Sequence, residues 1–296
     1  VPLYSDVEEL LNSKNLDAVI VATPNRLHET HAVKILKKKI PVLLEKPISD
    51  NIKSAKKIID SSKKNKTPLL IGYHRRHNSI VSKVKDVISS GKLGNIVSAN
   101  VLCWFYKHKE YYKETWRTNK GGGPLGINLV HDIDLICYLL GPIQFVQAFT
   151  SKKIRKFKVE DTATVSLLFK SGTLCTLNIS DTIVAPWSYE LTAGENPAYP
   201  ITNQSAYVIG GTKGSIQFPN LKNWFYKNER SWWNKIIVKE DKNKKDDNTL
   251  INQINHFTDV VLKKTKPKVN GNDGLTSLKI FAAITKSAKT GKKIKI

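Results

Sequence analysis

The sequence has no methionine, few cysteines, little arginine and no long apolar run. No stretch approaches the roughly 20 apolar residues that a membrane-spanning helix needs, so no membrane partner is expected. Its three cysteines, Cys103, Cys137 and Cys175, are odd in number, lie far apart and form no C-x-x-C pair. This pattern argues against a disulfide framework and against a cysteine-based metal site. We therefore expect reduced thiols and a cytoplasmic protein.

The absence of methionine also means that Val1 is not an ordinary translation start. A dinucleotide site usually shows G-x-G-x-x-G after the first strand, and an acidic residue about 20 residues later binds the ribose. The sequence lacks this motif, and its glycine-dense segments at 121–126 and 210–214 have the wrong flanks. Because the chain also opens at a helix midway through an α/β unit, we predict that a first β-α-β unit is missing.

The net charge of +23 comes from 48 basic and 25 acidic residues, which raises the question of a nucleic-acid partner. Only six of the basic residues are arginine, the side chain preferred for bidentate contacts with phosphate and bases. The lysines are scattered over predicted helix faces, so we interpret them as solvated surface and expect no specific nucleic acid partner. A basic nucleic-acid binder is an alternative that only the charge supports.

The first quarter of the chain alternates short apolar runs with helical periodicity. Residues 16–22, 40–44 and 68–72 are continuous β-rich runs, typical of parallel strands covered on both faces. Helical patterns at 28–38 and 51–64 lie between them. This order predicts a doubly wound parallel sheet, so we interpret residues 1–76 as the remainder of a Rossmann-type dinucleotide-binding domain.

Beyond this point the apolar positions alternate with polar ones, which is typical of an antiparallel sheet with one solvated face. A helix at 127–140 and two amphipathic helices at 249–264 and 274–290 accompany the strands. We predict that residues 77–296 form an α+β domain with an open antiparallel sheet, within an α/β fold overall. The expected strands are 95–106, 145–150, 162–169, 173–180, 188–192, 206–210, 215–218 and a final edge strand at 292–296.

Four motifs occur in order along the chain. They are Thr23-Pro24-Asn25-x-x-His28, Glu45-Lys46-Pro47, Gly72-Tyr73-His74-Arg75-Arg76, and a glycine loop at 121–126 followed by His131-Asp132-Ile133-Asp134. Each is weak alone, but their order and spacing resemble the Gfo/Idh/MocA family of glucose–fructose oxidoreductases and inositol dehydrogenases. The resemblance runs essentially the whole length. It implies a nicotinamide-dependent oxidoreductase that transfers a hydride between NAD or NADP and a sugar, polyol or cyclitol alcohol.

The resemblance also implies which residues contact the cofactor. Ligands of open α/β sheets bind at strand ends, and Thr23, Pro24 and Asn25 end one expected strand. A simple strand-stopping turn is the alternative for these three residues. His28 is a candidate cofactor contact or a helix-surface residue. The segment Glu45, Lys46 and Pro47 ends the next strand and completes the expected cofactor-binding set.

Lys46 and His131 are the expected catalytic residues, by resemblance to the family. A lysine that follows a buried strand has a lowered pKa when partly desolvated, and it can then exchange protons with a substrate hydroxyl. Pro47 is a candidate for a cis peptide that aims this lysine. Histidine suits the removal of a hydroxyl proton as hydride leaves carbon. Asp134 is expected to orient or anchor the helix that carries His131.

The expected substrate-binding residues come from both predicted domains. They are Tyr73, Arg75, Trp116, Arg117, Asn128 and His131. Arg75 or Arg76 could alternatively form an ion pair between domains.

One position departs from the family pattern. Many members carry an aspartate four residues before the histidine, where this chain has Ile127. Asn128 would point roughly 100° away from that position on a regular helix. A catalytically silent ligand-binding or scaffold protein of the same fold is therefore the alternative function. An exposed sheet face makes a homo-oligomer through the antiparallel sheet a further expectation.

Overall fold

The computed structural model describes residues 2–13, 15–241 and 248–296, and the chain divides into two compact units. Unit 1 comprises Val1–His77 and Thr249–Lys279, and unit 2 comprises Asn78–Asn248 and Ile280–Ile296. Each unit has its own buried apolar core. The division passes through helix α8 (Gly271–Thr290), so one helix supplies side chains to both cores.

Unit 1 is built on a three-stranded sheet in the order β1–β2–β3. Its strands are β1 (Val19–Val21), β2 (Val42–Leu44) and β3 (Leu69–Ile71), and both neighbouring pairs are parallel. Every residue of β2 and β3 is buried, as expected for short aliphatic runs covered on both faces. The predicted parallel α/β arrangement is confirmed.

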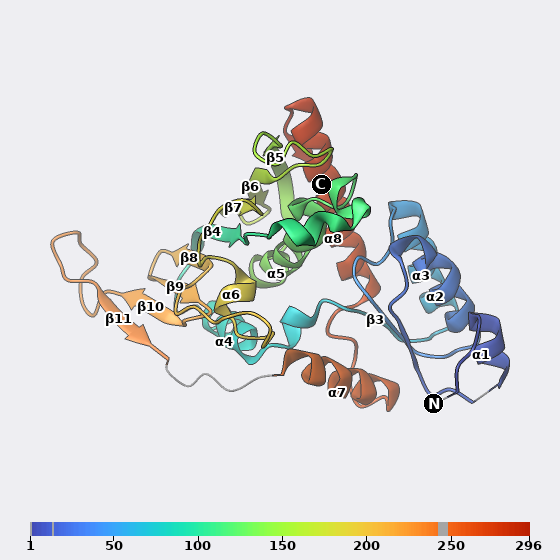
Figure 1. Cartoon of the computed structure of the whole chain (residues 1–296). Helices are drawn as coiled ribbons and strands as arrows, with labels where there is room; N and C mark the ends of the chain where they lie inside the picture. Colours follow the sequence, from blue (N-terminus) through green and yellow to red (C-terminus); the bar gives the residue numbers. More distant parts are fainter. Residues whose placement is uncertain (1, 14, 242–247) are drawn as a thin grey trace. The chain divides into compact units, whose positions relative to one another are not determined.

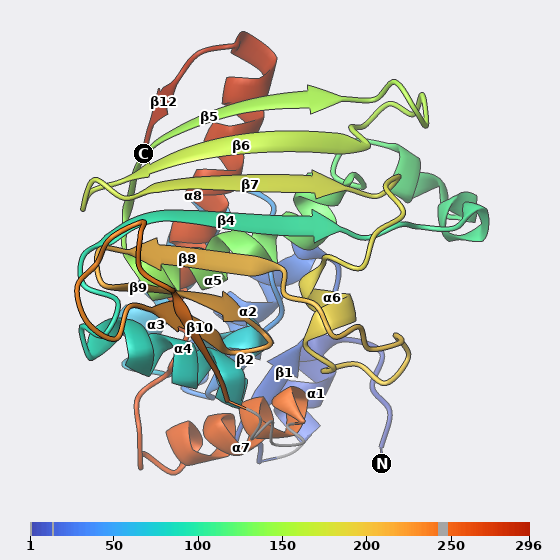
Figure 2. The same ribbon diagram turned by 90° about the vertical axis from the view of Figure 1, so that its left-hand side faces the viewer.

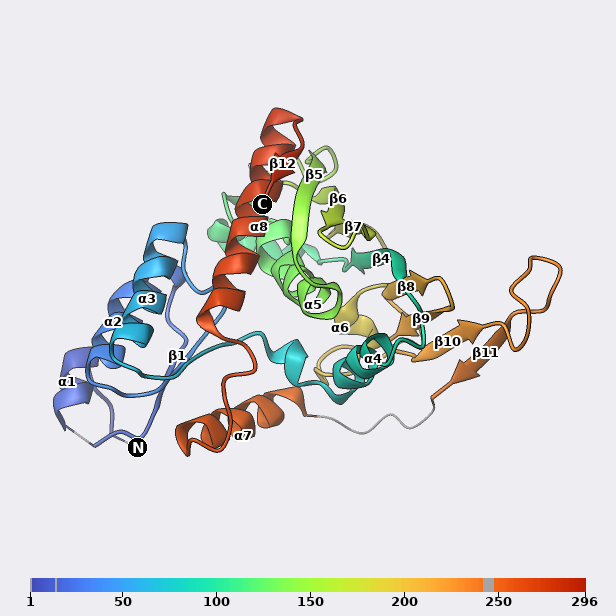
Figure 3. The same ribbon diagram turned by 180° about the vertical axis from the view of Figure 1, so that it is seen from behind.

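Helices of unit 1 alternate with these strands. They are α1 (Val7–Ser13), α2 (His28–Lys37) and α3 (Ile52–Lys64), with 3-10 turns at Asn25–Leu27 and His74–His77. Helices α2 and α3 lie side by side (Figures 1 and 3). The side chain of Asn51 begins α3 by accepting a hydrogen bond from the backbone N–H of Ser54, which satisfies one of the unpaired amides of the first turn.

A later part of the chain returns to complete unit 1. Helix α7 (Thr249–Val261) contributes Phe257 to the core, and the next segment contributes Val269, whose carbonyl accepts a hydrogen bond from Ile71 N at 3.0 Å. The sequence-based division assigned residues 77–296 to the second domain without interruption. The structure groups 249–279 with unit 1, because the apolar side chains of this segment are part of the unit 1 core.

Unit 2 contains a nine-stranded sheet in the order β11-β10-β9-β8-β4-β7-β6-β5-β12. Figure 2 shows β5, β6, β7, β4 and β8 running side by side. The neighbours β4 and β7 pair in parallel, whereas each other neighbouring pair is antiparallel, so the sheet is mixed rather than wholly antiparallel as predicted. The strands are β4 (Ile96–Trp104), β5 (Ile143–Ser151), β6 (Thr162–Phe169), β7 (Leu174–Ser180), β8 (Tyr207–Gly211), β9 (Gly214–Phe218), β10 (Lys222–Phe225), β11 (Ile237–Glu240) and β12 (Ile294–Lys295).

Helices cover one face of this sheet. Behind it in Figure 2 lie α5 (Val130–Leu140) and the C-terminal half of α8, and both contribute buried residues to the unit 2 core. Helix α4 (Ser79–Ser89) and 3-10 turns at Lys109–Lys113 and Thr115–Thr118 complete the unit. Gly141, with φ of 94°, ends α5 in a conformation that glycine adopts without steric cost.

One local prediction differs from the structure, and two strands were not predicted. Residues 188–192, predicted as a strand, form helix α6 (Tyr189–Thr192), because the Ser188 hydroxyl caps it by accepting from Leu191 N at 3.3 Å. Strands β10 and β11 escaped prediction because their residues are only partly buried and show no clear alternation. The final edge strand is confirmed as β12, which pairs with β5. Within the described residues, no helix has the length and apolar character needed to cross a bilayer.

Two imidazoles of unit 1 lie together where the 3-10 turn after β3 meets α7. The rings of His77 and His256 are 5.0 Å apart between centroids, and His77 is 7% exposed. Nε2 of His77 is buried without a hydrogen-bond partner among the described residues. Burial, followed by the charges of His256, Lys268, His74 and Arg76, lowers the pKa of His77 to about 3. Burial also lowers the pKa of His256.

This pair makes unit 1 sensitive to acid. The unfolded chain protonates His77 near pH 6.5, whereas the folded chain resists protonation down to about pH 3, so stability is lost as the pH falls through this window. We predict that the free energy of unfolding decreases by about 2 kcal/mol between pH 7.5 and pH 5 on account of this residue. Urea unfolding at both pH values checks this. His77→Phe should show a much smaller pH dependence, and an equal dependence in both proteins would contradict the assignment.

Candidate functional site

Three of the predicted motifs leave the same edge of the unit 1 sheet. Val21 pairs with Leu44 and Leu44 pairs with Ile71, and these are the last residues of the three strands. The motif segments at 23–25, 45–47 and 72–76 follow directly. In-register parallel strands therefore bring all three to one carboxyl edge, where open α/β sheets bind ligands.

His28 holds two of these segments together. Its ring is 0% exposed, and its Nδ1 and Nε2 lie 3.0 Å from the Pro47 carbonyl oxygen and 2.8 Å from the Thr23 carbonyl oxygen. Each ring nitrogen thus faces a backbone carbonyl of one of the two loops. His28 was predicted as a cofactor contact or a helix-surface residue, but the structure places it inside unit 1, where it positions the loops.

The segment around Lys46 is held closely against its neighbours. Its backbone N–H donates to Glu45 Oε2 at 3.0 Å, and the Lys46–Pro47 peptide bond is cis, which confirms the prediction for Pro47. A Cβ atom at Gly72 would lie 3.2 Å from Glu45 Cα, so a larger residue there would press on this loop. The Lys46 side chain is half-buried at the strand end.

The motif after β3 is mostly interior. Tyr73 is 1% exposed and belongs to the unit 1 core, although the sequence analysis expected it to bind substrate. Arg75 and Arg76 are also buried. Arg76 forms an ion pair with Asp273 of α8 at 3.4 Å, and both residues belong to unit 1. This ion pair lies within one unit, so it is not the ion pair between domains that was the alternative for Arg75 or Arg76.

In unit 2, the glycine loop packs against the Trp116-Arg117 motif. A Cβ atom at Gly122 would lie 2.3 Å from the Trp116 carbonyl oxygen, and one at Gly123 would lie 2.3 Å from Glu160 Oε1. The backbone therefore excludes a side chain at Gly122, whereas a side chain at Gly123 would require the Glu160 carboxylate to move. The Glu160 carboxylate accepts a hydrogen bond from Leu125 N at 3.2 Å, and burial raises the pKa of this carboxyl.

The backbone after this loop is a π-helical turn at Leu125–Leu129, which leads into α5. A regular helix, expected here from the sequence, would point Asn128 away from the position of Ile127. The wider turn changes that register, and such turns often occur at functional sites. Asn128 is buried: its Oδ1 accepts from Lys107 Nζ at 2.8 Å, and its Nδ2 donates to Glu190 Oε1 at 3.2 Å. His131, one turn later, is also buried.

Lys107 follows β4 and is 6% exposed. Its Nζ lies 4.6 Å from the Tyr111 ring centroid and 3.4 Å from the Tyr111 hydroxyl. The Arg117 guanidinium lies 4.1 Å from the same ring centroid, and Arg117 Nη1 donates to the Tyr111 carbonyl at 2.7 Å. Burial is the largest influence on Lys107 and lowers the pKa of its amine, while the negative charges of Asp181 and Glu190 act in the opposite direction.

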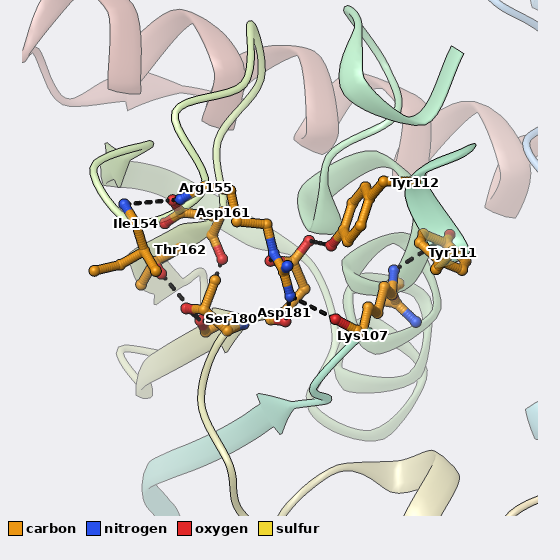
Figure 4. A network of polar contacts seen from close by, with 11 residues as sticks. Lys107, Tyr111, Tyr112, Ile154, Arg155, Asp161, Thr162, Ser180 and Asp181 are labelled. Atoms are coloured by element: carbon orange, nitrogen blue, oxygen red, sulfur yellow. Dashed lines mark hydrogen bonds and ion pairs between the residues drawn. The ribbon is translucent and has the colours of Figure 1, made fainter. Parts of the chain in front are cut away.

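A buried ion pair holds the backbone of Lys107 (Figure 4). Arg155 donates from Nε to Asp181 Oδ1 at 2.8 Å and from Nη2 to the carbonyl oxygens of Lys107 and Asp181. The Tyr112 hydroxyl donates to Asp181 Oδ2 at 2.5 Å, and its pKa is raised by burial and by this carboxylate. Lys107 N donates to the Asp181 carbonyl at 3.0 Å. The pair therefore fixes the position of the Lys107 backbone, from which the side chain extends.

The predicted residues thus fall into two groups. In unit 1, Thr23, Asn25 and Lys46 share one sheet edge, whereas His28 and Tyr73 are interior. In unit 2, the structure connects Arg117 to Asn128 through Tyr111 and Lys107, and Trp116 is exposed beside them. Sequence reasoning missed Lys107, Tyr111 and Glu190. The signal available was a lysine directly after a predicted strand, the same pattern that singled out Lys46.

Comparisons with known proteins agree with this architecture. Residues 1–73 match the family described as "Oxidoreductase family, NAD-binding Rossmann fold", and residues 85–296 match "Oxidoreductase family, C-terminal alpha/beta domain". A myo-inositol 2-dehydrogenase of Thermotoga maritima is 24% identical over 99% of this chain and 84% of its own length. An oxidoreductase of Formosa agariphila is 24% identical over 72% of this chain, and the match spans 63% of that protein, less than two thirds of its length.

A solved structure shows the same fold. The WlbA dehydrogenase from Bordetella pertussis, in complex with NADH and UDP-GlcNAcA, matches with a TM-score of 0.79 and 23% identity, covering 99% of this chain and 83% of that chain. The resemblance predicted from the four motifs is confirmed by the two family matches, and the expected NAD-binding class of fold is confirmed with it. Among the described residues, no group of three or more His, Cys, Asp or Glu side chains is arranged to hold a metal ion.

The Arg155–Asp181 pair gives a stability prediction for unit 2. Asp181→Asn keeps the shape of the side chain but leaves the buried guanidinium without its charged partner. We expect the free energy of unfolding to decrease by about 3–5 kcal/mol, measured by urea titration at pH 7. Glu8→Gln is the control, because the Glu8–Lys34 pair is exposed and should contribute less than about 1 kcal/mol. A loss for Asp181→Asn no larger than that of the control would contradict the role given to this pair.

Proposed function

Because the chain belongs to the Gfo/Idh/MocA oxidoreductase family, we propose that it uses NAD or NADP to oxidise or reduce an alcohol of a sugar, polyol or cyclitol. The observation that carries this proposal is the carboxyl edge of the unit 1 sheet, where three strands in register deliver the motif segments at 23–25, 45–47 and 72–76. A dehydrogenase that acts on myo-inositol is among the relatives, which supports a polyhydroxylated substrate.

The residues at this edge fit a nicotinamide cofactor. Asn25 is exposed and Lys46 is half-buried, and an amide and an ammonium are donors that the hydroxyl and phosphate oxygens of a dinucleotide accept. His28 fixes the loops that carry these donors. When bound, NAD or NADP supplies the hydride chemistry, while the protein supplies orientation and proton management.

Lys46 and His131 are the catalytic residues of this proposal. As an alcohol is oxidised, the proton leaves its hydroxyl oxygen and a hydride leaves the carbon that bears this oxygen. The His131 imidazole accepts that proton as general base, since histidine titrates near neutral pH. The Lys46 ammonium is a hydrogen-bond donor that a substrate hydroxyl accepts, and such a bond favours ionisation of the hydroxyl. In the reduction direction the His131 imidazolium returns the proton to the oxygen.

Ile127 is the residue that raises the alternative of a catalytically silent binding protein. Isoleucine cannot transfer a proton, so the aspartate that many relatives carry has no direct replacement there. Asn128 is instead held by hydrogen bonds to Lys107 and Glu190 on the turn before His131. We propose that this polar chain supports the helical turn of His131, and that catalysis proceeds without a carboxylate at residue 127.

The outer face of the unit 2 sheet supports a further proposal, that the protein is a homo-oligomer. In a chain with 25% charged residues, the outward side chains of β4, β6 and β7 include no charged group. Phe149 and Leu174 are 67% and 58% exposed on β5 and β7. Interface centres are depleted in charge in the same way. We expect sedimentation equilibrium to show an oligomer that Leu174→Glu dissociates. A monomeric wild-type protein would contradict this proposal.

The catalytic assignment is tested by steady-state kinetics on the complete protein. We predict that Lys46→Ala and His131→Ala each lower kcat/KM by about 10²- to 10⁴-fold, because each removes a group that handles the hydroxyl proton. Nicotinamide absorbance with a panel of sugars, polyols and cyclitols is the readout. Lys53→Ala, on the exposed side of α3, is the control and should leave the rate unchanged. Rates that stay at the wild-type level in both test variants would reject the assignment.

A further inference from the structure

Unit 2 places two cationic side chains around one aromatic ring. Nζ of Lys107 and Cζ of Arg117 lie 4.6 Å and 4.1 Å from the Tyr111 ring centroid. Neither cation has a carboxylate oxygen within ion-pair distance among the described residues. Two positive charges therefore lie close together, and no acidic side chain in contact neutralises them.

The acidic groups nearby make hydrogen bonds to other residues. Asp181 accepts from Arg155 and from Tyr112, and Glu190 accepts from the neutral amide of Asn128, so both act on Lys107 through their charge and not by contact. Lysine is rarely buried as fully as Lys107 unless its charge is paired, because an unpaired buried charge loses its hydration without compensation. The arrangement of unit 2 is thus suited to an additional anion next to Lys107.

Both cations keep donors for such an anion. An ammonium has three N–H donors, and Lys107 directs two of them to Asn128 and Tyr111. Arg117 donates from Nη1 to the Tyr111 carbonyl, and its Nη2 makes no hydrogen bond within the described residues. A planar guanidinium and an ammonium are the groups that proteins use to bind carboxylate and phosphate oxygens.

The pair lies close to the proposed general base of the same unit. Lys107 bonds Asn128, and Asn128 precedes His131 by three residues, on the turn that leads into α5. Trp116 is exposed beside Arg117, with the guanidinium 5.3 Å from its ring centroid, and it offers an apolar surface for a sugar ring. An anion held here would belong to the molecule on which His131 acts.

We propose that Lys107 and Arg117 form an anion subsite in unit 2, which binds a carboxylate or phosphate group carried by the substrate. The substrate class is then an acidic sugar or polyol, either a sugar acid or a sugar phosphate, rather than a neutral one. This inference rests on the proposed oxidoreductase function for its substrate, but the subsite itself is defined by the geometry of unit 2. The net charge of +23 would also accelerate the encounter with an anion.

Isothermal titration calorimetry on the complete protein tests the subsite without requiring turnover. The probes are D-glucuronate, glucose 6-phosphate and glucose, which share a ring and differ in the charged group. We expect the wild-type protein to bind one or both acidic sugars at least about tenfold more tightly than glucose. The stronger of the two identifies carboxylate or phosphate as the preferred anion. Equal affinity for all three probes would overturn the proposal.

Lys107→Met and Arg117→Gln each remove one cation while keeping most of the side-chain volume. Each should abolish most of the preference for the acidic sugar and leave glucose affinity unchanged. Lys109→Met and Arg230→Gln remove cations from exposed positions and are the matched controls. If circular dichroism shows that Lys107→Met does not fold, Arg117→Gln alone tests the subsite, because the Arg117 side chain is only half-buried and its replacement should be tolerated. A preference that survives in Arg117→Gln would overturn the proposal.

Failure of the subsite and failure of the enzymatic function give different results. His131→Ala should retain the acidic-sugar preference while losing hydride transfer, if both proposals hold. A wild-type protein that shows the preference but no nicotinamide-dependent turnover would overturn only the proposed function. Turnover with neutral sugars, with no preference for acidic ones, would overturn only the subsite.

Discussion

The buried ion pair between Arg155 and Asp181 is the interaction on which the arrangement of unit 2 depends. Arg155 comes from the loop between β5 and β6, Asp181 follows β7, and the segment that they hold follows β4. One guanidinium therefore connects three strand ends by binding a carboxylate and two carbonyl oxygens. Because that charge is satisfied internally, the neighbouring cation of Lys107 remains without a carboxylate in contact, next to the turn that carries Asn128 and His131.

In unit 1, the register of the paired strands positions the loops that carry the motif residues. Three short parallel strands end at paired residues, so the loops that follow them emerge together. The imidazole of His28 then contacts a backbone carbonyl of each of two loops, and so positions the loops that carry Asn25 and Lys46. The sheet and one buried histidine therefore position the polar groups that would contact a cofactor. In unit 2, by contrast, the Arg155–Asp181 ion pair has this role. Each unit thus presents donors from rigid strand ends.

Sequence reasoning predicted the parallel sheet of unit 1 well, because continuous apolar runs such as Val42–Leu44 have few alternatives to a buried strand. The order and spacing of the four motifs also predicted the family. It failed where long-range contacts decide the outcome. The return of α7 to unit 1, the burial of Tyr73 and the π-helical turn before α5 depend on packing partners distant along the chain. Lys107 directly follows an expected strand, as Lys46 does, but its burial depends on contacts such as that with Asn128, 21 residues further along the chain.

We propose that a bound anion supplies the counter-charge of the buried Lys107 amine. The direct measurement is an NMR titration of its ε-carbon in ¹³C-lysine-labelled protein, with Lys107→Met assigning the signal. We expect this amine to titrate below the ordinary lysine pKa of about 10.4, because burial disfavours its charged form. A saturating acidic sugar should raise the pKa, since a nearby anion stabilises the ammonium. An ordinary lysine pKa that does not respond to the acidic sugar would rule out an anion next to Lys107.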